Sequence, residues 1–274
     1  MSINNQYYKL RKYLYNMKHG FDIRIVSYEY IHNINQKDWN KLLEAISPKP
    51  KETILDGMCG YGAVGKGILG REKSINLFLL DESEVQMERA KENLPQVPKN
   101  RFIIASLPKS EFREEFFDKV VIKMGLHEAP KKEQLKIAKE VYKILKPSGK
   151  FIVWDIFLND QTQHFFQDVI RKKDELAGFD MLTKERYFFR EDEFLDTMKK
   201  ANFSKIKEFH TFQYRFSSKR RLESELHNDK KKLDLLNEFI RKRCPEELKK
   251  TLKFQDNLDD IQFTITNKIF VMSK

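Results

Sequence analysis

A glycine-rich segment between residues 55 and 65 carries the clearest chemistry in this sequence. Gly60, Gly62 and Gly65 fit the pattern G-x-G-x-x-G, and Asp81 follows Gly60 by 21 residues. Glycines let the backbone turn tightly and approach a ligand, and in dinucleotide-binding folds an acid at this spacing binds ribose hydroxyls. The pattern predicts a cofactor that contains a nucleoside, and a nicotinamide dinucleotide of a dehydrogenase is one candidate.

The residues before the glycines favour a different cofactor. Asp56 closes the preceding apolar run, and three residues separate it from Gly60, whereas a dinucleotide loop turns at its first glycine directly after the strand. An acid at this place adds negative potential, which suits a positively charged ligand. The segment 56–62 resembles the D-x-G-C-G-x-G signature of the class I S-adenosylmethionine-dependent methyltransferases.

The resemblance continues in order from about residue 52 to residue 157 and is closest to the small-molecule branch, similar to the quinone-biosynthesis type. It implies S-adenosylmethionine as the cofactor. The further matching segments are Asp81-Glu82-Ser83, Ala105-Ser106-Leu107-Pro108, Phe117-Asp118-Lys119-Val120-Val121-Ile122 with Leu126-His127, and Leu145-Lys146-Pro147-Ser148-Gly149-Lys150-Phe151.

The family pattern implies roles for individual residues. Asp81 would bind the ribose hydroxyls, and Ser106 would lie beside the adenine, where many members carry an acid. Met58 departs from the pattern because it replaces a glycine. The implied cofactor-binding residues are Asp56, Gly57, Met58, Cys59, Gly60, Gly62, Asp81, Glu82, Ser106, Leu107 and Lys123.

Methyl transfer is an in-line displacement that requires alignment of the two reactants and, for some acceptors, removal of a proton. Ligands of open α/β sheets bind at the carboxyl ends of the strands. His127 follows the expected fourth strand and Asp155 the fifth, so we predict catalytic roles for both. The histidines and the two cysteines lack the spacing of metal ligands, so no metal site is expected.

Aromatic residues near both ends of the chain indicate the kind of acceptor. Six of the ten tyrosines lie within residues 7–30, and a late apolar segment is rich in phenylalanine. Such side chains could enclose a small aromatic or apolar molecule. The predicted substrate-binding residues are Tyr13, Tyr15, Tyr28, His127 and Phe212.

Short apolar runs alternate with helical patterns over the middle of the chain, which predicts an α/β fold with helices on both faces of a mostly parallel sheet. We expect a Rossmann-like, doubly wound sheet of seven strands whose last strand is antiparallel. Residues 1–48 would form a helical, aromatic lid over a methyltransferase domain of residues 49–274. A helical insertion at 219–257 would separate the last two strands.

Composition narrows the function classes without deciding among them. The chain has 274 residues, 40% of them apolar, and too few glycines and cysteines for a collagen-like or disulfide-rich protein. No stretch reaches the roughly 20 apolar residues that span a membrane. The N-terminus lacks the apolar core of a signal peptide, so we expect a cytoplasmic protein.

The formal charge of +11 raises nucleic acid as a partner. The excess lies at the two ends, where acidic residues are interspersed, and no Asn-Pro-Pro motif of base-methylating enzymes is present. We therefore expect a methyltransferase with a small-molecule acceptor. An RNA methyltransferase that uses the basic terminal regions and a non-catalytic partner protein with the same fold are the alternatives, and the acceptor atom and the oligomeric state stay open.

Overall fold

The computed structural model describes residues 35–179 and 185–274. Most of the predicted lid, including Tyr13, Tyr15 and Tyr28, therefore lies outside the described residues. The described end of that region is helix α4 (Gln36–Ile46), which Asn35 caps by accepting a hydrogen bond from the backbone N–H of Lys37 at 2.8 Å.

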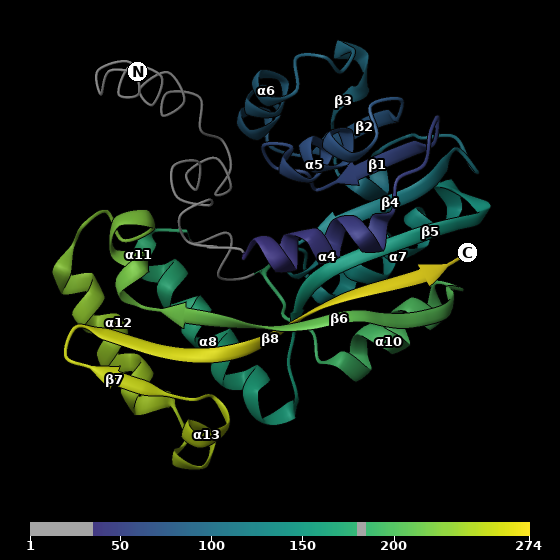
Figure 1. Cartoon of the computed structure of the whole chain (residues 1–274). Helices are drawn as coiled ribbons and strands as arrows, with labels where there is room; N and C mark the ends of the chain where they lie inside the picture. Colours follow the sequence, from purple (N-terminus) through teal and green to yellow (C-terminus); the bar gives the residue numbers. More distant parts are fainter. Residues whose placement is uncertain (1–34, 180–184) are drawn as a thin grey trace.

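A single twisted sheet forms the centre of the described part of the chain (Figure 1). Its strands follow the order β3-β2-β1-β4-β5-β8-β6, and a short strand β7 pairs with β8 outside this path. The first five strands pair in parallel, and β8 runs antiparallel to both of its long neighbours. The strands are β1 (Thr53–Gly57), β2 (Asn76–Asp81), β3 (Phe102–Ile104), β4 (Phe117–Lys123), β5 (Leu145–Phe157), β6 (Ser204–Ser217), β7 (Gln255–Asn257) and β8 (Asp260–Ser273).

Helices cover both faces of this sheet, as the alternating pattern of the sequence predicts. Side chains on α4, α5, α6 and α8 pack on one face, and side chains on α7 and α10 pack on the other. The remaining helices are α5 (Ala63–Arg71), α6 (Glu84–Asn93), α7 (Lys131–Ile144), α8 (Asp160–Ala177), α10 (Glu191–Lys200), α11 (Lys219–Ser224), α12 (Lys230–Arg243) and α13 (Glu246–Thr251), with 3₁₀ turns η2 (Lys99–Arg101), η3 (Leu107–Lys109) and η4 (Leu126–Glu128).

The two layers of the core follow from the alternation of side chains along each strand. Ile54 and Val121 belong to the cluster under α4 and α5, whereas Leu55 and Val120 belong to the cluster under α7. Because neighbouring residues of a strand point to opposite faces, runs in which every residue is apolar are buried on both sides. This double burial explains why the central strands are continuous apolar runs in the sequence.

The mostly parallel fold with an antiparallel final strand is confirmed, and the sheet has eight strands rather than seven. The additional strand is β7, a three-residue segment that forms a hairpin with the start of β8. It lies inside the region predicted as a helical insertion, which otherwise holds α11, α12 and α13. Helix α12 packs beside α8 beyond the central sheet (Figure 1).

No helix among the described residues is long and apolar enough to cross a membrane. The cytoplasmic location stays a prediction.

Gly62 is required both for its backbone conformation and for the close packing around it. It precedes α5 with φ of 79°, and a Cβ there would lie 2.9 Å from Leu94 Cδ1 and 3.1 Å from Leu79 Cδ2. We expect Gly62→Ala to lower the free energy of unfolding by about 2 kcal/mol or more, measured by urea denaturation. Gly70→Ala in the same helix is the control, because a Cβ there meets nothing within 4 Å. It should be neutral or stabilise by up to about 1 kcal/mol. Equal effects at both positions would contradict this explanation.

Candidate active site

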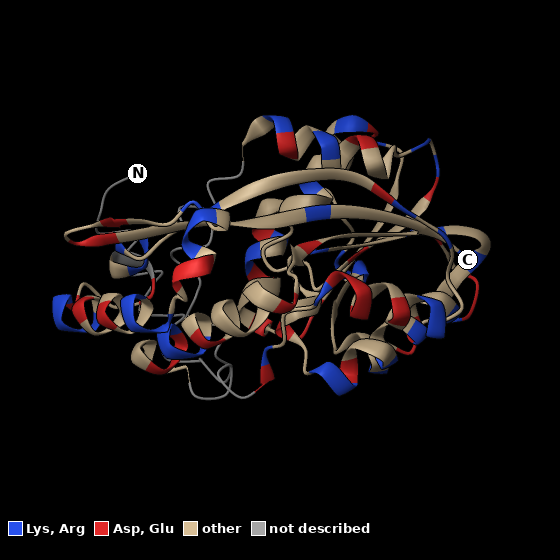
Figure 2. Cartoon of the chain, turned by 90° about the horizontal axis from the view of Figure 1, so that it is seen from below, with Lys and Arg blue, Asp and Glu red and all other residues tan. Residues whose placement is uncertain are grey.

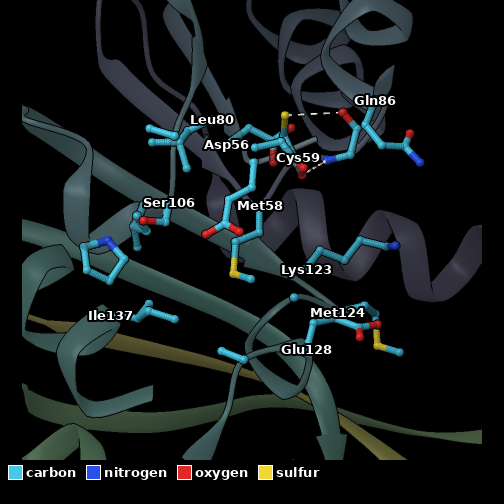
Figure 3. A pocket seen from close by; sticks show the side chains of 18 of the residues that line it. Asp56, Met58, Cys59, Leu80, Gln86, Ser106, Lys123, Met124, Glu128 and Ile137 are labelled. Atoms are coloured by element: carbon cyan, nitrogen blue, oxygen red, sulfur yellow. Dashed lines mark hydrogen bonds between the residues drawn. The ribbon is translucent and has the colours of Figure 1, made fainter. Parts of the chain in front are cut away.

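A cavity of about 520 Å³ opens at the carboxyl ends of β1, β2 and β4. In the strand order of this sheet, the chain connections reverse direction between β1 and β4, which is where open α/β sheets bind their ligands. The volume falls in the range of small-molecule sites. The lining residues come from the glycine loop, the ends of β2 and β3, η4 and the start of α7, and Figure 3 shows many of them.

Asp56 joins the end of β1 to the first turn of α5. Its Oδ2 accepts a hydrogen bond from the backbone N–H of Gly65 at 2.8 Å, and the side chain is buried. Burial raises the pKa of Asp56 to about 8, although the Gly65 N–H and the charge of Lys123 act in the opposite direction. A positively charged ligand in the cavity would favour the ionised carboxylate and lower this pKa.

Asp81 holds the glycine loop from the end of β2. Its Oδ2 accepts from the N–H of Gly60 at 2.8 Å, and its Oδ1 accepts from the N–H of Ser83 at 3.0 Å. The Cys59 N–H also donates to the Leu80 carbonyl at 3.0 Å. The loop is thus fixed to β2 on both sides of Gly60, with the carboxylate of Asp81 at the cavity wall.

Lys123 ends β4 and brings a cation to the cavity. Burial lowers the pKa of Lys123 to about 8, against the attraction of Asp56 and Asp155. Its Nζ lies 5.5 Å from the centre of the Trp154 ring. The side chain therefore lies among two carboxylates and an aromatic face, which partly replace the water that it loses.

His127 and Asp155 form a buried pair behind the cavity. His127 Nδ1 lies 2.5 Å from Asp155 Oδ1, and the ring stacks on Phe188 with 4.6 Å between the ring centres. Burial alone would lower the pKa of His127, but Asp155 and Glu128 raise it to about 10. At neutral pH the imidazole is therefore a cation held by carboxylates, and it cannot accept a proton from an acceptor molecule.

Glu128 connects this buried pair to the cavity. Its Oε1 lies 3.3 Å from His127 Nε2, and its Oε2 accepts from Arg186 Nε at 2.7 Å. Unlike His127 and Asp155, Glu128 lines the cavity. Glu128 therefore lies between the imidazole of His127 and the guanidinium of Arg186 at the cavity wall.

The ionic contacts continue away from the cavity through the interior. Arg186 Nη1 lies 3.2 Å from Asp174 Oδ2, and Lys173 Nζ lies 2.5 Å from Asp174 Oδ1 and 2.7 Å from Glu225 Oε1. Arg221 then contacts Glu225 at 3.6 Å. These side chains are all buried, so a chain of alternating charges runs from η4 to the end of α11.

Nine of the eleven residues predicted to bind the cofactor line this one cavity. Gly57 and Gly62 do not, because Gly57 faces Ile122 and Leu107 within the sheet and Gly62 begins α5. Phe212 is not among the lining residues either. It packs edge-to-face on Trp154 with 4.7 Å between ring centres, so its role in substrate binding stays a prediction.

Several lining residues were not predicted from the sequence. They are Gln86 on α6, Ile137 on α7, and Glu185, which is the residue directly before Arg186. Helical residues that face a cavity have the same apolar or polar pattern as residues that face the core or solvent, so no local signal identifies them. Among the described residues, no cluster of histidine, cysteine and acidic side chains could hold a metal ion.

Comparison with known proteins agrees with this geometry. Residues 54–149 match the methyltransferase domain family, and this range extends from β1 into the first part of β5. The ubiquinone/menaquinone biosynthesis C-methyltransferase UbiE of Rickettsia bellii is 29% identical over 178 residues, which cover 58% of this chain and 71% of that enzyme. The sterol 24-C-methyltransferase ERG6 of Saccharomyces cerevisiae is 28% identical over 166 residues, covering 52% of this chain and 43% of that enzyme.

The matched range carries the same loop, acid and strand ends that form the cavity. Residues 54–149 form a methyltransferase domain, and the chain is an S-adenosylmethionine-dependent methyltransferase. A solved structure of the YcgJ protein from Bacillus subtilis shares the fold of this methyltransferase, with a TM-score of 0.72 at 14% identity over 86% of this chain and 98% of that chain. Phosphoethanolamine N-methyltransferase 2 of Haemonchus contortus, solved with S-adenosyl-L-methionine, has a TM-score of 0.57 at 16% identity over 96% of this chain and 59% of that chain.

The residues that line the cavity of the methyltransferase fit the chemistry of S-adenosylmethionine. Carboxylates of Asp56, Asp81 and Glu82 suit a ligand with a sulfonium cation and a ribose diol. Ala105, Leu107 and Pro108 add apolar surface to the lining, which suits the flat adenine ring.

The raised pKa of His127 makes a testable contribution to the stability of the methyltransferase. Because the folded-state pKa lies above the ordinary 6.5, the contribution is complete below pH 6.5 and is lost as the pH rises towards 10. We expect the stability difference between the wild type and His127→Gln to narrow by up to about 1.4 kcal/mol per pH unit between pH 7 and 9. Urea unfolding at each pH measures it. His164→Gln on the exposed face of α8 removes an imidazole without disturbing the buried carboxylates and serves as the control. A difference that does not change with pH would contradict the assigned charge.

Proposed function

We propose that this enzyme transfers the methyl group of S-adenosylmethionine to a small aromatic or apolar acceptor by in-line displacement. The observation that carries the proposal is one cavity that joins the cofactor-binding motifs to an end lined by Met124, Glu128 and Ile137. A cavity of this size, set within the fold, suits a metabolite rather than a polymer. The names of both relatives support it, because one acts in ubiquinone/menaquinone biosynthesis and the other on a sterol.

The residues of the cofactor end take the following proposed roles. Asp81 would accept hydrogen bonds from the ribose hydroxyls while it holds Gly60, and Ser106 and Leu107 would flank the adenine. Asp56 would face the positive charge of the cofactor through the loop. The cofactor supplies an activated methyl group with a neutral thioether as leaving group, so the protein needs to align the acceptor and exclude water.

We further propose that His127 and Asp155 act as positioning residues rather than as the base itself. The pair fixes one oxygen of Glu128, and Arg186 fixes the other. Glu128 would then be the group that meets the acceptor and accepts a hydrogen bond from its O–H or N–H. This arrangement retains the predicted importance of His127 and Asp155 but places the contact with the acceptor one residue further along the chain.

The basic C-terminal region does not favour RNA as the acceptor. Arg241 binds Asp256 at 2.8 Å, Arg243 binds Asp168 at 2.5 Å and Lys219 binds Asp259 at 2.6 Å. Figure 2 shows Lys and Arg interleaved with Asp and Glu over the helices. Basic side chains that already pair with carboxylates present a weaker field to phosphates than a continuous basic groove does.

Cofactor binding gives the first test. We expect calorimetry to show binding of S-adenosylhomocysteine, and Asp81→Ala to weaken it about 10- to 100-fold because hydrogen bonds to a carboxylate are lost. Glu84→Ala, an exposed substitution nearby on α6, is the matched control. NADH should give no thermal stabilisation. Binding of NADH in preference to S-adenosylhomocysteine would contradict the proposed function and would favour a dehydrogenase.

The acceptor class has a direct test of its own. The purified enzyme is incubated with S-adenosylmethionine that carries a labelled methyl group and with either 1,4-naphthoquinol, a lipid-soluble metabolite extract or total RNA. We expect label in organic-soluble product and none in RNA. Label in RNA that decreases steeply with added salt would refute the small-molecule acceptor.

A further inference from the structure

Met58 adopts a backbone conformation that is unusual for its residue type. Its φ is +53°, in the left-handed region that glycine adopts freely and other residues occupy at a cost of about 1 kcal/mol or more. The family pattern has a glycine at this position, so the chain has kept the loop conformation while adding a side chain. Strain of this kind persists where the surrounding structure holds it, and it occurs often at functional sites.

Gly125 is the residue that makes room for this side chain. A Cβ built on Gly125 would lie 2.9 Å from Met58 Cβ and 3.2 Å from Met58 Sδ. Gly125 itself has φ of −118°, which any residue adopts, so the conformation does not require glycine there. Glycine is required at this position because the Met58 side chain occupies the space that a Cβ would need. Met58 and Gly125 are therefore matched in size, one large and one small.

This contact lies where the two ends of the cavity meet. Met58 follows β1 and Gly125 follows β4, and these neighbouring strands flank the point at which the sheet reverses its connections. In Figure 3 the Met58 side chain lies between Asp56 and Ser106 on one side and Glu128 and Ile137 on the other. The thioether of Met58 therefore lines the part of the cavity between the ends of β2 and β3 and the turn η4.

We propose that Met58 is a specificity-determining residue that limits the space around the group being transferred. The inference rests on the proposed function, because the adenosine of the cofactor would occupy the end near Asp81 and Ser106. The sulfonium and its substituent would then lie at the boundary between β1 and β4, against Met58. A flexible thioether can pack closely around a methyl group but leaves little room for a larger one.

The test compares cofactor analogues that differ only at the sulfur, so it needs no acceptor. Calorimetry gives the affinities of S-adenosylmethionine, its S-ethyl analogue S-adenosylethionine, and S-adenosylhomocysteine, which lacks the substituent. One additional methylene in a filled pocket weakens binding about tenfold or more. We expect this discrimination in the wild type, a reduction to within about threefold in Met58→Gly, and an intermediate value in Met58→Ala. The affinities of each variant are expressed relative to its own affinity for S-adenosylhomocysteine, so that a general change in cofactor binding cancels and only the effect of the group on the sulfur is compared.

Gly125→Ala tests the same contact from the opposite side. The added methyl group pushes Met58 into the cavity, so discrimination against the S-ethyl analogue should increase. Gly125→Ala in the Met58→Gly background should not increase the discrimination, because the side chain that the added methyl group would displace is absent. Thermal melting of each variant confirms folding, and Met58→Ala retains the test if Met58→Gly does not fold. Equal discrimination in the wild type and Met58→Ala, or none in the wild type, would overturn the role of Met58. Failure of the wild type to bind S-adenosylhomocysteine would overturn the proposed function instead.

Discussion

The hydrogen bond from the Gly65 N–H to the buried carboxylate of Asp56 determines how the rest of the site is arranged. It ties the end of β1 to the first turn of α5, so that the loop between them must bend at the carboxyl edge of the sheet. Gly65 permits this close approach, because a Cβ there would lie 2.9 Å from Leu77 and 3.3 Å from Asp56 Oδ2. The third glycine of the motif thus serves the packing of helix against sheet, and Gly60 and Gly62 serve the turn.

A second constraint comes from the buried charges that extend from the cavity to the helical insertion. Each charge loses water on burial, and the loss is offset only when a partner of opposite sign lies in contact. Glu128, Arg186 and Asp174 meet this condition in turn, although they belong to η4, the segment before α10, and α8. A hydrophobic core would hold these segments together with more tolerance for small shifts. Charged contacts require a defined geometry, because an ion pair weakens when either partner moves away.

The two constraints give the two ends of the cavity different characters. The cofactor end is fixed by backbone hydrogen bonds to Asp56 and Asp81, so its shape is built into the strand ends. The other end depends on side chains from segments that meet only through the packing of α8 and α10 against the sheet.

The sequence by itself determined the succession of strands and helices along the chain. A strand buried on two faces is a short run of apolar residues, and a helix repeats its apolar residues every three or four positions, so both patterns can be recognised within one segment. Apolar residues recur at helical spacing along α8 and alternate along β8. The glycine loop and Asp81 were also predictable, since a tight turn requires particular residues at particular spacings. The short strand β7 was not, because Gln255–Asn257 has no apolar pattern and pairs only because β8 offers a free edge.

The relation of His127, Asp155 and Glu128 was decided by the tertiary structure. The sequence predicted that His127 and Asp155 follow neighbouring strands, which is wrong for Asp155 because β5 continues to Phe157 and contains it. The sequence also could not show that both side chains are buried while Glu128 reaches the cavity. Arg186, which forms an ion pair with Glu128, lies 58 positions further along the chain. The contact between Met58 and Gly125 likewise exists only because β1 pairs with β4. Burial and charge pairing depend on which distant segments pack against each other, and the pattern of residues within one segment does not specify its partners.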